Sequence, residues 1–96
     1  MEKVNIAEKF GKIRDYWKPC IAAELNGQLV KLDKLKGEFV WHRHDREDEL
    51  FLVVPRGVEH RPVADEEAWV VLFEPASTHN TGNVQNELSL EELERI

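Results

Sequence analysis

Two histidines separated by one residue are the best candidates in this sequence for binding chemistry. His42 and His44 lie in the segment 37–44, whose composition favours an extended chain. Alternate side chains of an extended segment point to the same face, so both imidazoles share one face with Val40. The opposite face would carry Phe39, Trp41 and Arg43. We therefore expect two imidazoles that point the same way.

A carboxylate follows at a spacing that brings it to the same place. Residues 45–48 are all charged and have the composition of a four-residue hairpin loop, which would set His44 directly across from Glu49 on the next strand. Cross-strand neighbours have Cβ atoms roughly 4.5–5.5 Å apart, and His42 would lie on the same face at roughly 7 Å. Imidazole nitrogens and a carboxylate oxygen suit a divalent first-row metal. The alternative is a surface strand with incidental histidines.

The length and composition indicate one globular domain over residues 1–96. The chain is 42% hydrophobic and 33% charged, with a formal net charge of −6. Because it has no basic stripe with interleaved aromatic residues, we do not expect a nucleic-acid partner. The longest apolar run, residues 50–54, is too short to span a bilayer, and residues 1–4 do not resemble a signal peptide. A cytoplasmic location is therefore expected. Cys20 is the single cysteine, which excludes an intrachain disulfide and a cysteine-based metal cluster.

The elements that must position the histidines are mainly strands. We expect strands over residues 21–25, 28–35 and 68–74, besides the histidine segment and the run from Glu49 to Val54. Asn26-Gly27 suits the tight turn between the first two, and Lys36-Gly37 would turn the chain into the histidine segment. The polar residues 64–67 suggest another turn. The apolar residues on both faces of 68–74 predict a strand buried on both sides.

A short helix is expected near each end of the chain. Asn5 can cap a helix over about residues 6–14, and Glu8 stands at the position of the reciprocal acid. Ser89 and Glu92 form a capping box that would open a terminal helix. Between the last strand and this helix, residues 77–86 have a loop composition. The histidine in that loop, His79, has no phased partner and is expected to be solvated.

Two motifs in order give the chain a family resemblance. The first is a glycine, His-x-His and a glutamate, found here as Gly37, His42, His44 and Glu49. The second is Pro-x-Gly-x-x-His, found as Pro55, Gly57 and His60. In these features the chain resembles a small single-domain cupin, a jelly-roll β-barrel metalloprotein. The resemblance implies a barrel cavity with one divalent metal, which the residue types do not resolve among Zn, Fe, Mn and Ni, held by His42, His44, Glu49 and His60.

The spacing between the two motifs departs from the family pattern. On the order of 20 further residues are expected there at ordinary strand and turn lengths, so the chain resembles a shortened cupin with an internal deletion. A local hairpin would pair His60 with Leu52 or Val53. The Leu52 pairing points His60 to the wrong face, and Val53 lies roughly 13 Å along the strand from Glu49. Three alternatives remain: irregular pairing after Glu49, a His60 supplied by a second chain, or a metal with three protein ligands and water.

The loss of interior strands also predicts a partner. An open sheet edge beside the apolar residues 50–54 invites pairing with another copy, because a barrel avoids this hazard only by closing. We therefore expect a homodimer, with or without exchanged strands.

The sequence leaves the activity undecided between three classes of protein. A metal-dependent enzyme acting on a small polar molecule would use the open coordination positions of such a site, and the resemblance implies dioxygenase or sugar-phosphate isomerase chemistry. A shortened barrel that keeps the metal but lacks defined catalysis is the favoured interpretation, because removing strands opens the cavity to water. The third class is a structural protein that binds no metal. No catalytic residue is identified.

Overall fold

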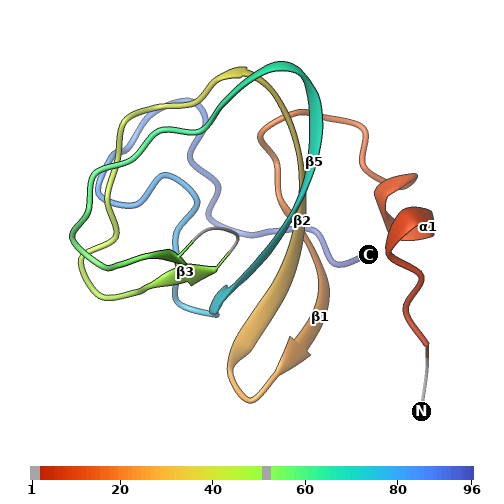
Figure 1. Cartoon of the computed structure of the whole chain (residues 1–96). Coiled ribbons are helices and arrows are strands. Elements are labelled where there is room, and N and C mark those ends of the chain that lie inside the picture. The colour runs from red at the N-terminus through yellow and green to blue at the C-terminus, as the bar shows by residue number, and fades with distance from the viewer. Residues whose placement is uncertain (1–2, 51–52) are drawn as a thin grey trace.

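The computed structural model describes residues 3–50 and 53–96. Its elements are helix α1 (Ile6–Phe10) and strands β1 (Cys20–Leu25), β2 (Gln28–Glu38), β3 (Glu49–Leu50), β4 (Val53–Val54) and β5 (Val63–Pro75). The strands form one antiparallel sheet in the order β1-β2-β5-β3-β4, in which the long strands β2 and β5 are strongly curved (Figure 1). The expectation of a mainly β chain is confirmed. Within the described residues, no helix is long and apolar enough to cross a membrane.

The hairpin of β1 and β2 forms as the sequence predicts. Asn26 and Gly27 have φ values of 52° and 77°, the left-handed conformation that a two-residue hairpin turn of type I′ requires. The turn sets Leu25 opposite Gln28. Strand β2 extends past the predicted turn at Lys36-Gly37, which is instead an irregularity in its pairing with β5.

Strand β5 is longer and less buried than expected. It begins at Val63, so the predicted turn over residues 64–67 is wrong: residues 65–67 bulge within the strand while β2 continues alongside, with Gly37 opposite Ala64 and Glu38 opposite Val63. The prediction of burial on both sides is wrong for Trp69 and Val71, which are exposed. The outer face of the sheet is only partly covered, chiefly by Phe10, which stacks on Trp69 with ring centroids 4.8 Å apart.

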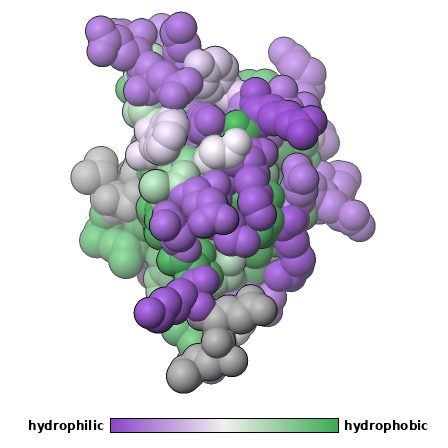
Figure 2. All heavy atoms as spheres, turned by 90° about the vertical axis from the view of Figure 1, so that its right-hand side faces the viewer, coloured by the Kyte–Doolittle hydropathy of each residue, from purple (hydrophilic) through white to green (hydrophobic). Residues whose placement is uncertain are grey.

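Helix α1 forms where Asn5 caps it. The Asn5 side chain accepts a hydrogen bond from the backbone N–H of Glu8 at 3.0 Å. The helix ends at Phe10 rather than near residue 14, and the chain then turns so that both Phe10 and Ile13 pack with Leu32. The face of the molecule on the side of α1 is largely hydrophilic (Figure 2).

The predicted C-terminal helix is absent from the described residues. Residues 94–96 instead pair with the free edge of β1: Ile21 donates to Glu94 O at 2.8 Å and accepts from the Ile96 N–H at 2.9 Å. A short helix over the same residues would be marginal without tertiary support. Edge pairing satisfies the same backbone groups and places Ile96 against the core.

Candidate metal centre

The histidine segment places its two imidazoles as the alternation predicts. His42 and His44 are each 4% exposed, whereas Trp41 between them points outward. Phe39 departs from the pattern, because it is buried against Trp17 with ring centroids 4.9 Å apart instead of facing away with Trp41. Strand β2 ends at Glu38, and the chain turns inward from there.

His60 reaches the cluster by pairing with His42 in the same chain. The two residues exchange backbone hydrogen bonds, His60 N–H to His42 O at 2.8 Å and His42 N–H to His60 O at 3.0 Å. Residues 39–44 and 57–62 therefore run side by side (Figure 1). Irregular pairing after Glu49, the first of the three alternatives, is the one that the structure adopts.

The segment between the two motifs forms a small hairpin of its own. Strands β3 and β4 pair Glu49 with Val54 and Leu50 with Val53, so the local hairpin that would pair Val53 with His60, already too long for a shared metal, does not form. The pairing of Leu52 with His60, and the middle of the predicted strand from Glu49 to Val54, lie outside the described residues. His44 is not paired with Glu49 in a hairpin, as the loop length suggested, although their side chains meet.

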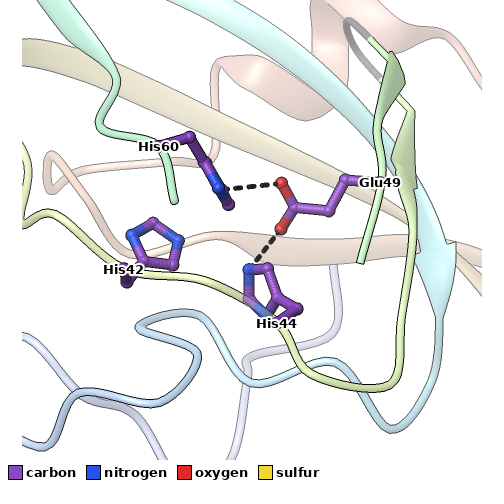
Figure 3. A group of neighbouring side chains, drawn as sticks. All are labelled: His42, His44, Glu49 and His60. Atoms are coloured by element: carbon purple, nitrogen blue, oxygen red, sulfur yellow. Dashed lines mark ion pairs between the residues drawn. The ribbon is translucent and has the colours of Figure 1, made fainter. Parts of the chain in front are cut away.

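Four side chains converge on one point (Figure 3). One donor atom from each of them lies within 4.8 Å of the others. The carboxylate of Glu49 sits between two rings, with Oε1 at 2.6 Å from His44 Nε2 and Oε2 at 3.2 Å from His60 Nε2. Donor atoms that share a metal at about 2.0–2.2 Å lie roughly 3–4 Å apart. The donor atoms of the predicted residues His42, His44, Glu49 and His60 therefore lie within about 1 Å of the spacing of a metal site.

Backbone carbonyls orient two of the rings for metal binding. His42 Nδ1 lies 2.9 Å from Val40 O and His60 Nδ1 lies 3.0 Å from Val58 O. Each Nδ1–H therefore donates to a carbonyl, and each Nε2 is left with its lone pair free, as in metal-bound histidines. His44 Nε2 is buried and, despite its closeness to Glu49, makes no hydrogen bond of good geometry. A metal ion would satisfy all these nitrogens.

The protonation states also suit metal binding. Burial lowers the pKa of His42, and the neighbouring rings of His60 and His44 lower it further, so His42 is neutral at physiological pH. Burial alone would raise the pKa of Glu49, but the interactions of its carboxylate with the neighbouring side chains of His44 and His60 outweigh burial, and the pKa of Glu49 is lowered. Neutral imidazoles and an ionised carboxylate are the forms that bind a divalent cation.

A second layer of buried charge lies behind Glu49, on β2 and β5. Lys31, 1% exposed, contacts Glu74 Oε1 at 2.7 Å and also donates to Thr78 O. Burial, together with the neighbouring charge of Glu49, raises the pKa of Glu74 to about 7 although Lys31 opposes the shift. The sequence interpretation missed this pair. The available indication was the alternation of Lys31 and Asp33 with apolar residues in the strand predicted over residues 28–35.

A loop far along the chain supports the histidine segment. Asn83 clamps the backbone of Arg43: its N–H donates to Arg43 O at 3.0 Å and its side-chain oxygen accepts from the Arg43 N–H at 2.8 Å. Gly82, with φ +54°, packs so closely that a Cβ there would overlap Arg43 O and lie 3.1 Å from the His42 ring. His79 in the same loop is half-buried rather than solvated, and it is not in the cluster.

A small cavity of about 50 Å³ opens beside the cluster. Its polar walls include three ligands of the cluster and, from the sheet, Asp33 and Glu74. Its apolar walls are formed by side chains such as Trp17, Leu35, Phe39, Val70 and Leu72. The cluster therefore faces a small, partly open cavity.

The buried carboxyl of Asp33 should make stability fall as pH rises. Burial raises the pKa of Asp33 from 3.8 to about 7, so its contribution to stability is complete below 3.8 and is lost as the pH rises through 7. Between pH 5 and pH 8 the free energy of unfolding of the metal-free protein should fall by roughly 3 kcal/mol more than that of Asp33→Asn, at about 1.36 kcal/mol per pKa unit. Urea unfolding of both proteins at both pH values measures this difference. Glu74 is present in both proteins, so equal pH profiles would contradict the prediction.

Comparison with known proteins identifies the fold and the family. No family model matches the chain, and no curated protein matches it. Among solved structures, a cupin-2 domain-containing protein of Shewanella frigidimarina has a TM-score of 0.67 and 33% identity, over 75% of this chain and 93% of its own. A protein of Neisseria meningitidis has a TM-score of 0.68 and 28% identity, over 77% of this chain and 99% of its own. With this identity over nearly the whole length of the Shewanella protein, and with both histidine motifs folded into one cluster, the chain belongs to the cupin family.

Proposed function

We propose that this cupin binds one divalent transition metal through His42, His44, Glu49 and His60. The observation that carries the proposal is the convergence of three imidazoles and one carboxylate, with donor atoms within 4.8 Å of one another. The donor set suits Zn, Fe, Mn or Ni and contains no thiolate that would favour softer ions. A bound ion would supply Lewis-acid chemistry at the mouth of the cavity.

We propose metal binding without an assigned reaction as the primary function of a shortened cupin. The connection between the two motifs is reduced to β3 and β4, strands of two residues each, which supports an internal deletion. The cavity of about 50 Å³ has room for only a few atoms. A metal-dependent enzyme of the dioxygenase or isomerase type is the second candidate, favoured by the position of that cavity beside the cluster.

Metal analysis of protein produced without a histidine tag tests the primary function. The purified protein is stripped with a chelator and titrated calorimetrically with Zn²⁺, Mn²⁺, Ni²⁺ and, under anaerobic conditions, Fe²⁺. We expect one ion per chain and a rise in melting temperature on binding, because an ion that binds only the folded state stabilises it. Binding well below one ion per chain for all four metals, with no thermal shift, would overturn the proposal.

We also propose a homodimer, with or without exchanged strands. Strand β4 is at the edge of the sheet, and near it Val53 is 74% and Leu50 is 50% exposed. A second copy would cover this edge. Light scattering at micromolar concentration should give twice the chain mass of 11.2 kDa. A monodisperse particle of the mass of one chain would contradict this prediction.

A further inference from the structure

Asp33 has an unpaired carboxylate oxygen in the wall of the cavity beside the metal cluster. Its side chain is buried, with 7% of the residue exposed, and Oδ1 makes no hydrogen bond. Asp33 lines the cavity together with His42, Glu49 and His60. A ligand in this space would therefore touch the metal site and Asp33 at once.

The other polar groups of the cavity wall are already engaged. Asn80 donates from its amide nitrogen to Leu88 O at 2.7 Å and accepts the Leu90 N–H at 3.0 Å, so both ends of its amide are used. Glu74 also keeps one oxygen without a hydrogen bond, but its charge is paired with Lys31. Outside the cluster, the acidic residues of this wall that the structure describes are Asp33 and Glu74. Glu74 is paired with Lys31, whereas Asp33 has no cationic partner among the described residues within salt-bridge distance.

Such a group is costly for folding and needs an explanation. A buried carboxyl without a hydrogen-bond partner costs on the order of 1–3 kcal/mol, more when it is charged. Buried unsatisfied groups are rare in native proteins, and residues kept at a cost to stability concentrate at functional sites. An apolar side chain of the same shape would fit the neighbouring walls of Leu35, Val70 and Leu72 without this cost.

The size and charge of the cavity define the class of ligand. One water occupies about 10–15 Å³ of such a volume, so about 50 Å³ holds a molecule of only a few heavy atoms. No lysine or arginine is among the lining residues that the structure describes, and three carboxyls are, those of Asp33, Glu49 and Glu74. An anion such as a phosphate or carboxylate would therefore meet acidic groups in the cavity, and an ammonium group would be repelled by a bound divalent ion, whereas a hydroxyl can donate to Asp33.

We propose that Asp33 selects the ligand of the metal site, and that the ligand is a small uncharged molecule with at least two hydroxyl groups. One oxygen would lie toward the metal cluster, and a second hydroxyl would donate to Asp33 Oδ1. This inference rests on the proposed metal site.

Probes of equal size test the inference with a spectroscopic readout. The protein is loaded with Co²⁺, whose visible absorption reports ligand binding, and titrated at pH 8 with ethane-1,2-diol, acetate or 2-aminoethanol. These probes each have four heavy atoms and differ in charge. The titrations are repeated with Asp33→Leu, which keeps the branched shape but removes the acceptor. Asp65→Leu, the same substitution at an exposed aspartate outside the cavity wall, is the matched control.

We expect the wild type to bind the diol more tightly than the other two probes. Asp33→Leu should bind the diol about tenfold more weakly, because a hydrogen bond to a charged group is lost, and acetate as well or better. When both proteins are free of metal, Asp33→Leu should also melt at a higher temperature than the wild type. If Asp33 had a structural role, the variant would melt at a lower temperature. Asp65→Leu should keep the preference for the diol.

The outcomes separate this inference from the proposed function. A wild type that binds no Co²⁺ overturns both. Normal Co²⁺ binding with a preference for acetate or 2-aminoethanol, a diol affinity unchanged in Asp33→Leu, or a lower melting temperature of Asp33→Leu overturns the role of Asp33 alone.

Discussion

His44→Ala should abolish metal binding, whereas His79→Ala should leave it intact. His44 is 4% exposed and its Nε2 is directed at Glu49 within the cluster, while His79 belongs to the supporting loop and lies outside the cluster. Loss of a second-layer partner typically costs 10–100-fold in metal affinity, so loss of a ligand should cost about a hundredfold or more. Calorimetric titration of the stripped proteins with Zn²⁺ measures the change.

The comparison of the two histidine variants controls for the loss of an imidazole from the chain. Circular dichroism and melting of the metal-free proteins show whether each variant folds. The thermal shift on adding metal should vanish in His44→Ala and persist in His79→Ala. Equal metal affinities of the two folded variants would place the metal somewhere other than the cluster.

Gly82→Ala should damage both the fold and the metal site. Gly82 has φ +54°, and a Cβ there would overlap Arg43 O, lie 2.9 Å from the carbonyl carbon of Arg43 and lie 3.1 Å from the His42 ring. The left-handed conformation costs an alanine roughly 1–2 kcal/mol, and the overlap adds strain of about 1–3 kcal/mol. Because the loop must push the histidine segment away, we also expect metal affinity to fall about tenfold or more. Urea unfolding and Zn²⁺ titration measure the two effects.

Gly27→Ala is the matched control for this prediction. Gly27 also has a positive φ, +77°, but a Cβ there would have nothing within 4 Å. This variant should lose only the conformational cost and should bind metal as the wild type does. If Gly82→Ala were no less stable than Gly27→Ala and bound metal equally well, the packing of the loop on the histidine segment would have no role in the site.

Local patterns in the sequence were sufficient for the features that depend on neighbouring residues. The cap at Asn5 and the turn at Asn26-Gly27 formed as predicted, because both depend on the backbone preferences of one or two residues. The shared inward direction of His42 and His44 followed from the alternation of an extended chain. The predicted C-terminal helix failed because the open edge of β1 competes for the same backbone groups.

The sequence by itself determined which four side chains can bind a metal, because the residue types and the two motifs contain that information. Only the tertiary structure decided how His60 joins them, since it pairs with His42, eighteen positions away, and not with the strand that precedes it. The tertiary structure also decided that Asp33 lies in the cavity wall. Asp33 is on the inward face of β2, and this face borders the cavity only because β2 and β5 curve around the cluster. Contacts between distant segments depend on the packing of the whole sheet, which short-range patterns do not specify.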